Sequence, residues 1–259
     1  MAQRKKIEKD NFIKFLGTAG ARFVMLKQLR ASAGIWINFS GTNILIDPGP
    51  GSLVKCLSSR PKLDPAKLDA VLLTHRHLDH ANDVNVILEA ITEGGFKKRG
   101  VLFTPSDAIE AEPIILRHLR EIVHIELLKP HTNYEIGGIK FSTGMCHIHS
   151  TETYGFKFNL GEKTVSLISD TRYFDGLSDF YKADIVIINV VFYEPHPQVD
   201  HLSLEDAEKI INDLRPHCTI LTHFGMTMLK AKPHLLEEEL SRRLKIKVVC
   251  AYDGMTVKI

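Results

Sequence analysis

The 259-residue sequence lacks several features that would mark a specialised class of protein. It has only four cysteines, and none form a CxxC pair, so neither a disulfide framework nor a zinc knuckle is expected. The net charge is only +2, and no basic stripe with interleaved aromatic residues indicates a nucleic-acid surface. The longest apolar run, Ile185–Tyr193, is interrupted by Asn189 and is too short to span a bilayer.

The first ten residues also lack the apolar segment of a secretory signal. They mix four basic side chains with Glu8 and Asp10, so we expect a frayed N-terminus at residues 1–10. With free cysteines, a reducing cytoplasmic location and no membrane partner are expected. No low-complexity tract or linker divides the chain, which favours one domain over residues 1–259. A homo-oligomer can be neither predicted nor excluded from these features.

Short apolar segments bounded by Gly, Pro, Asp or Asn predict a chain rich in strands. Helical patterns fall between some of them, at Ala81–Thr92, Ser203–Leu214 and Lys232–Leu244. Ser203 is a plausible N-cap with Asp206 three residues later. Mixed sheets with helices outside them are therefore expected. The predicted strands are Phe12–Leu16, Gly34–Phe39, Asn43–Ile46, Ala70–Thr74, Val101–Thr104, Ile139–Thr143, Tyr154–Asn159, Thr164–Ser169, Asp184–Val191, Cys218–Thr222, Lys247–Ala251 and Met255–Lys258.

The stretch LLTHRHLDHA, residues 72–81, places four metal-ligand side chains directly after a buried strand: His75, His77, Asp79 and His80. In extended backbone, residues two apart point the same way, so His75 and His77 can hold one cation. The chain must then turn into a helix, which can direct Asp79 and His80 toward a second cation. Imidazole suits zinc, iron or manganese.

Two later strands resemble this one in ending on a ligand residue. AVLLTH (70–75), VSLISD (165–170) and TILTH (219–223) together suggest one convergent site at a sheet edge. The segment CHIHS adds His147 and His149 after another strand. Two ions can then be accommodated, with Asp170 shared between them because a carboxylate has two oxygens. The two sets are His75, His77 and His149, and Asp79, His80 and His223.

The order HxHxDH, followed by His, Asp and His at strand ends, resembles the metallo-β-lactamase superfamily. The segments FLGTAG (15–20), ILIDPGPGS (44–52) and VLLTHRHLDH (71–80) are similar to that family's opening segments, in the same order. The likeness covers nearly the whole chain. It implies an α+β fold, a four-layer αββα sandwich of two mixed sheets with helices on the outer faces.

Within the superfamily, the ribonuclease Z and phosphodiesterase branch is the most similar. HSTETYGFKF (149–158) and SDTRYF (169–174) resemble segments of that branch and favour His149 over His147 as ligand. His147 would then support the site from behind. DHLSLEDAEKI (200–210) resembles the segment that carries a further catalytic histidine, here His201. By the same resemblance Asp47 supports the metal loop, although an Asp before Pro48 can also simply begin a turn.

The sequence differs from ribonuclease Z in one feature that concerns the substrate. Ribonuclease Z carries a long arm that grips transfer RNA, whereas residues 155–170 leave room only for two strands and a turn at Gly161-Glu162. A small cyclic or nucleotide-like phosphodiester is therefore expected in place of transfer RNA.

The resemblance implies a hydrolase with two divalent ions, zinc foremost, with manganese or iron as alternatives. A hydroxide bridging the ions would attack phosphorus. Asp79 would orient this nucleophile, and His201 would donate a proton to the leaving group or hydrogen-bond a phosphoryl oxygen.

Three other functions use the same residues. A hydroxide of this kind also attacks the carbonyl carbon of a lactone, thioester or other carboxylic ester. An iron-dependent oxidoreductase of the same fold is a second alternative, although this chain has no length left for a flavin domain. The third is a non-catalytic metal-binding scaffold, which would not need two metals with an open bridging site.

Overall fold

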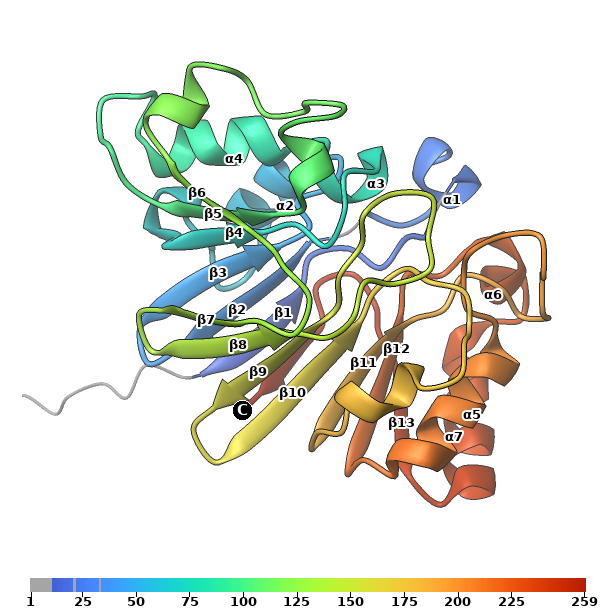
Figure 1. Cartoon of the computed structure of the whole chain (residues 1–259). Helices are drawn as coiled ribbons and strands as arrows, with labels where there is room; N and C mark the ends of the chain where they lie inside the picture. The colour runs from blue at the N-terminus through green and yellow to red at the C-terminus, as the bar shows by residue number, and fades with distance from the viewer. Residues whose placement is uncertain (1–10, 21, 33) are drawn as a thin grey trace, which may run out of the picture.

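The computed structural model describes residues 11–20, 22–32 and 34–259. The expected frayed terminus, residues 1–10, lies outside the described residues. Two seven-stranded sheets face one another across an apolar core (Figure 1). The predicted strands are all present, with ends within about two residues of the expected positions.

The first sheet contains the N-terminal strands together with the last strand of the chain. β14 returns from the C-terminus to pair antiparallel with β1, while β3, β4, β5 and β6 run parallel to one another. Its strand order is β14 (Thr256–Lys258), β1 (Phe12–Phe15), β2 (Ile35–Phe39), β3 (Thr42–Ile46), β4 (Ala70–Leu72), β5 (Val101–Thr104) and β6 (His124–Leu127).

The second sheet joins a parallel half to an antiparallel half. β10, β11, β12 and β13 are parallel, and β7, β8 and β9 extend the sheet by antiparallel pairs. Its strand order is β13 (Lys247–Cys250), β12 (Cys218–Thr222), β11 (Ile185–Asn189), β10 (Lys163–Ile168), β9 (Phe156–Leu160), β8 (Ile139–Thr143) and β7 (Asn133–Ile136).

Side chains alternate between the two faces of each sheet, and in the central parallel strands β4 and β11 both faces are buried. In β3, Ile44 and Ile46 join the core between the sheets, whereas Leu45 faces outward onto α2 (Ser52–Ser58) and α4 (Val84–Ile91). In β11, Ile187 faces inward, and its neighbours pack against α5 (Leu204–Leu214) and α7 (Pro233–Leu244). Strands buried on both faces read as continuous apolar runs. The predicted four-layer αββα sandwich is confirmed.

The helices differ in detail from the prediction. The predicted helix at 81–92 forms as α4, which begins only at Val84, and the turn before it is a separate short helix, α3 (Leu78–Ala81). The two are separate because Asp83, between them, makes hydrogen bonds outside the helix. Its backbone N–H donates to Pro48 and its carboxylate accepts from the Leu53 N–H. At α5, the predicted cap is confirmed, since Ser203 and Asp206 form a reciprocal capping box.

Several short elements were not predicted. β6 and β7 lie at the sheet edges, where half-exposed residues leave no apolar run to detect. The helices α1 (Phe23–Leu26), α2 and α6 (Met226–Lys230) are too short for a clear helical period. No helix of the described residues is long and apolar enough to cross a membrane.

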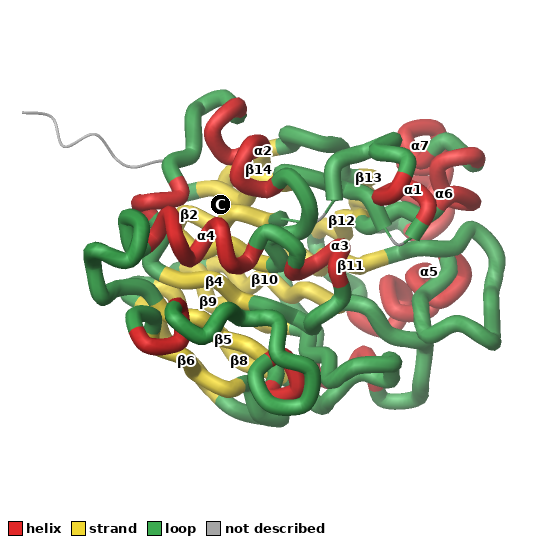
Figure 2. The backbone as a smooth tube through the Cα atoms, turned by 90° about the horizontal axis from the view of Figure 1, so that it is seen from above, coloured by secondary structure: helices red, strands yellow, loops and turns green. Residues whose placement is uncertain are grey.

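Parallel strands of both sheets end at the same side of the sandwich. Asp47 and His75 follow β3 and β4 of the first sheet, whereas Asp170 and His223 follow β10 and β12 of the second. The predicted convergent site therefore lies where the carboxyl ends of two sheets meet, and not at the edge of one. Seen from above, α3 lies over the middle of this end (Figure 2).

Candidate metal centre

The loop after β4 turns sharply within its ligand-type residues. His75 is fully buried, and its Nε2 lies 3.1 Å from Nδ1 of His77. His77 still has extended backbone, with φ −61° and ψ 150°, and α3 begins at the next residue. Asp79 and His80 fall in the first turn of this helix and are buried. The change from strand to helix separates the two pairs, as the sequence predicts.

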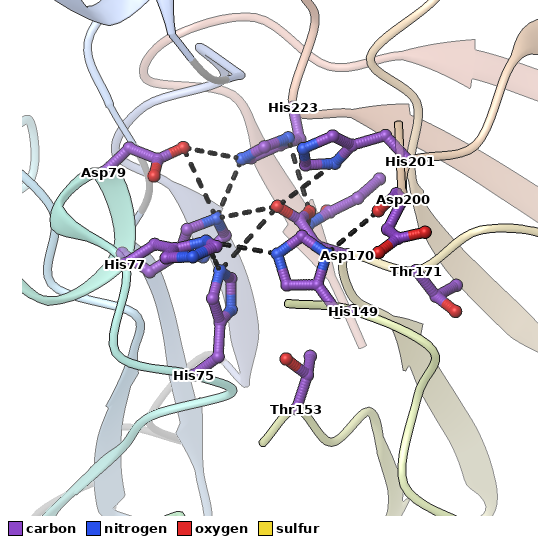
Figure 3. Close-up of polar contacts among 12 residues, drawn as sticks. His75, His77, Asp79, His149, Thr153, Asp170, Thr171, Asp200, His201 and His223 are labelled. Carbon is purple, nitrogen blue, oxygen red and sulfur yellow. Dashed lines mark hydrogen bonds and ion pairs between the residues drawn. The ribbon is translucent and has the colours of Figure 1, made fainter. Parts of the chain in front are cut away.

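Three residues from the second sheet complete this cluster (Figure 3). Nε2 of His149 lies 3.1 Å from Nδ1 of His77. Nε2 of His223 lies 2.9 Å from Nε2 of His80 and 3.2 Å from Oδ2 of Asp79. We call His75, His77 and His149 the His75 group, and Asp79, His80 and His223 the His80 group. Within each group the candidate ligand atoms lie within 4.8 Å of one another.

Asp170 lies between the two groups. Its Oδ2 is 3.4 Å from Nε2 of His80 and 3.9 Å from Nε2 of His75. His75, His80 and Asp170 also satisfy the 4.8 Å criterion. The structure therefore brings together all seven residues that the sequence nominates as ligands, in the predicted partition.

The donor atoms fit divalent cations. Two nitrogens bound to one tetrahedral zinc lie about 3.3 Å apart, close to the 2.9–3.1 Å between the ring nitrogens here. Oδ2 of Asp170 is buried and has no hydrogen-bond partner among the described residues. A buried carboxylate oxygen without a partner is costly. A cation between the groups would remove that cost.

The two groups differ in charge. Burial and the neighbouring His149 lower the pKa of His77 to about 4, so this ring is neutral at pH 7. In the His80 group, burial opposes ionisation of Asp79, but His80 and His223 outweigh it and lower its pKa to about 2. Burial likewise disfavours a charged His80, but Asp79, Asp170 and Asp47 raise its pKa well above the usual value. The His80 group is thus the more polar and more charged of the two.

Asp47 holds the loop after β4 in place by hydrogen bonds. Its carboxylate accepts hydrogen bonds from the backbone N–H and hydroxyl of Thr74, each at 2.7 Å. Its Oδ2 also lies 2.9 Å from Nδ1 of His80. Because the carboxylate accepts, Nδ1 of His80 carries the proton and Nε2 is directed into the cluster. Asp47 has a left-handed φ of 50°, which Asp tolerates better than most residues.

The two histidines of CHIHS take different positions. His149 directs Nε2 into the cluster, while its Nδ1 lies 2.9 Å from the Asp200 carbonyl. His147 lies behind Asp170, with Nδ1 3.2 Å from the Asp170 carbonyl, and belongs to no group. His149 therefore lies within the cluster and His147 outside it. Burial lowers the pKa of His147 to about 4, so it is neutral.

His201 lies at the margin of the cluster. Its Nδ1 is 3.5 Å from Oδ2 of Asp170, and its side chain is 10% exposed. Together with His149 and Asp170 it forms a further set that could hold an ion. Burial is the main cause that lowers its pKa below the usual value, so the neutral ring is favoured. The structure therefore places His201 within reach of whatever binds between the groups.

Comparisons with known proteins agree with this arrangement. The family model described as a Beta-lactamase superfamily domain matches residues 42–224. The chain belongs to the metallo-β-lactamase superfamily. It is 36% identical over 294 aligned positions to a ribonuclease Z of Methanopyrus kandleri, covering 98% of this chain and 99% of the relative. It is also 29% identical over 255 positions to an uncharacterized protein of Methanocaldococcus jannaschii, covering 95% of this chain and 94% of that protein.

A solved structure of the superfamily has the same fold. The metallo-β-lactamase fold protein YhfI from Bacillus subtilis superimposes with a TM-score of 0.80 at 21% identity, covering 96% of this chain and all of that one. Within this superfamily fold, residues 155–170 of the present chain form only β9, β10 and the turn at Gly161-Glu162.

Sequence reasoning missed three polar residues around the superfamily site. Thr74 donates twice to Asp47, and Asn189 donates its Nδ2 proton to Oδ1 of Asp170 at 2.8 Å. The Tyr181 hydroxyl lies 2.6 Å from Nε2 of His147. A signal existed for Asn189, because a polar residue interrupting an otherwise apolar strand needs a buried partner. Tyr181 lies in a loop, where the sequence carries no such signal.

Proposed function

We propose that the protein is a dinuclear metal-dependent phosphodiesterase that acts on a small cyclic or nucleotide-like phosphodiester. The observation that carries the proposal is the position of Asp170 between the His75 group and the His80 group. A carboxylate shared by two adjacent cation sites is the arrangement of two-metal hydrolases. The similarity to a ribonuclease Z supports phosphorus chemistry, because RNA is itself a phosphodiester.

Under this proposal, His75, His77 and His149 hold one ion, Asp79, His80 and His223 hold the other, and Asp170 serves both. Two divalent cations there would supply the Lewis acidity that makes water nucleophilic near pH 7 and would offset charge on phosphoryl oxygens. We propose zinc, because imidazole nitrogens dominate the donor set, with manganese and iron as the alternatives to test.

The protein's own residues would orient the reactants. Asp79 is ionised at neutral pH and accepts hydrogen bonds, so it can align the attacking water. His201, at the margin of the cluster, can hydrogen-bond a phosphoryl oxygen or give a proton to the leaving oxygen. Asp47 keeps His80 in the tautomer that presents Nε2 to the cluster.

The size of the substrate is argued from the short β9–β10 hairpin. No arm extends from residues 155–170 to hold a folded RNA, and the chain has little excess positive charge. Affinity for long nucleic acids rests largely on phosphate contacts by Lys and Arg. We therefore propose that recognition is confined to the immediate surroundings of the metal centre.

The test combines metal analysis with a substrate screen. The purified protein is loaded with zinc, manganese or iron, and hydrolysis of bis(p-nitrophenyl) phosphate is compared with that of p-nitrophenyl acetate and a set of lactones. The proposal predicts two ions per chain and preferential cleavage of the phosphodiester. Preferential ester or lactone cleavage would contradict the proposed substrate class. Bound iron with oxygen consumption and no hydrolysis would contradict the reaction type.

A further inference from the structure

The carboxylate of Asp170 is held on one side only. Oδ1 accepts the Asn189 amide proton at 2.8 Å, whereas Oδ2 faces the histidines without a hydrogen bond from the described residues. Since Oδ2 lies 3.4 Å from His80 and 3.9 Å from His75, a small shift of the Asp170 backbone would alter its distance to both groups. The position of this backbone is therefore critical to the centre.

A buried histidine restrains that backbone. Nδ1 of His147 lies 3.2 Å from the Asp170 carbonyl oxygen. A carbonyl can only accept, so Nδ1 carries the proton, and in a neutral ring Nε2 must then accept. The main chain of His147 is held in turn, because its N–H donates to the Thr153 carbonyl at 2.9 Å.

Tyr181 supplies the donor that Nε2 of His147 requires. It follows the short 3₁₀ segment Leu177–Phe180, is 2% exposed, and places its hydroxyl 2.6 Å from Nε2. Its own carbonyl accepts the Ser166 hydroxyl proton at 2.8 Å.

The backbone at Gly155 leaves space for the Tyr181 hydroxyl. A Cβ at Gly155 would overlap the Tyr181 hydroxyl and the Leu167 carbonyl, so only glycine allows the approach. The donors of the resulting chain point the same way, from the Tyr181 hydroxyl through His147 to the Asp170 carbonyl. A phenylalanine would fill the same volume, which means that packing alone does not explain the hydroxyl.

We propose that Tyr181 is a positioning residue that acts through His147 to set the place of Asp170 between the two cation groups. This inference rests on the proposed function, since it takes Asp170 as the carboxylate shared by two ions. His147 belongs to none of the groups that could hold an ion, and Tyr181 is buried behind it. Residues that orient ligands from behind commonly change metal affinity about 10- to 100-fold when they are lost.

The test compares Tyr181→Phe with Tyr134→Phe after loading with cobalt(II). Tyr134 is also buried, and its hydroxyl accepts the Lys129 N–H at 2.7 Å, but it has no connection to the metal centre. Chelator competition gives the affinity for each ion, and the visible absorption of cobalt reports its ligand geometry. Tyr181→Phe should lower the affinity for at least one cobalt ion by about 10- to 100-fold and change the cobalt absorption spectrum. Tyr134→Phe should change neither, whatever it does to thermal stability.

A second pair of variants tests the His147 link directly. Asn at position 147 can place its amide nitrogen near the place of Nδ1, whereas the longer Gln places its amide near Nε2. His147→Asn should therefore retain more cobalt affinity than His147→Gln. The inference is overturned if Tyr181→Phe matches wild type in affinity and spectrum, or if Gln at 147 performs as well as Asn. If the wild-type protein binds fewer than two cobalt ions, the proposed function itself fails.

Discussion

The first sheet supplies four of the seven candidate ligands from a single loop, whereas the second supplies three from three separate strand ends. His75, His77, Asp79 and His80 lie within the six positions 75–80 after β4, and one carboxylate, Asp47, holds that segment in place. His149, Asp170 and His223 are brought together only by the pairing of the second sheet. One half of the centre is thus a local structure, and the other is a product of the whole fold.

The largest loss of metal and activity is expected when a single ligand is removed, whether it comes from the first sheet or from the second. His77→Ala and His149→Ala should each cost one ion and reduce phosphodiesterase activity more than about 100-fold, beyond the usual effect of losing a supporting residue. Because both residues belong to the His75 group, the double variant should be little worse than either single variant. Elemental analysis gives the number of ions bound per chain, and an assay of phosphodiester hydrolysis gives the activity.

The matched control is His118→Ala. His118 is exposed and pairs with Glu89 on the surface, so its loss should change neither the number of bound ions nor the activity. If the effects of His77→Ala and His149→Ala add in the double variant, the two halves do not share an ion.

His201 comes from the second half but is proposed to act on the substrate. His201→Ala should keep both ions and slow turnover about 100-fold, as expected for loss of a group that hydrogen-bonds a phosphoryl oxygen or gives a proton to the leaving oxygen. His196→Ala, an exposed residue of the same loop, is the control and should remain near wild type. Full activity of His201→Ala would remove the proposed role, and loss of an ion would instead make His201 a ligand.

Asp47 supports the segment after β4 by hydrogen bonds, as Tyr181 is proposed to support Asp170 in the second sheet. Asp47→Asn retains a residue that tolerates the left-handed backbone but cannot accept all three hydrogen bonds. Metal affinity should fall about 10- to 100-fold, with the His80 group affected more than the His75 group. Chelator competition measures the change, and an unaltered affinity would show that Asp47 only forms a turn.

The two groups should also differ in their response to pH. The raised pKa of His80 means that this ring holds an extra proton at pH 7 without metal, whereas His77, with its pKa of about 4, holds none. An ion in the His80 group must displace that proton, so its affinity should fall up to about tenfold per pH unit on acidification. His77 should contribute nothing to the pH dependence of the His75 group between pH 8 and pH 6.

Calorimetry in two buffers of different ionisation enthalpy measures this difference. One proton released per ion in the His80 group is expected, with none from His77. Equal proton release by both ions would mean that the groups share one electrostatic environment.

The same comparison explains how far the sequence could predict the site. The local half is readable because its spacing alone separates His75 and His77 from Asp79 and His80. The distant half was found only because Asp170 and His223 each end a buried apolar strand, and His149 was preferred over His147 through resemblance. Tyr181 and Thr74 were not predicted, because neither belongs to a recognisable motif. The sequence alone therefore does not show which buried group their hydroxyls contact.

For the fold, the strands with continuous apolar runs were predictable and the edge strands were not. β11 is buried along its whole length, whereas β6 is nowhere fully buried and β7 is buried at one position. The break between α3 and α4 also escaped prediction, because it depends on Asp83 contacting Pro48 and Leu53 from a distant segment.

The most direct measurement is a crystal structure of the zinc-loaded protein with anomalous data at the zinc edge. The account predicts two peaks, one among His75, His77 and His149 and one among Asp79, His80 and His223, with the Asp170 carboxylate between them. A single peak, or peaks away from these residues, would contradict it.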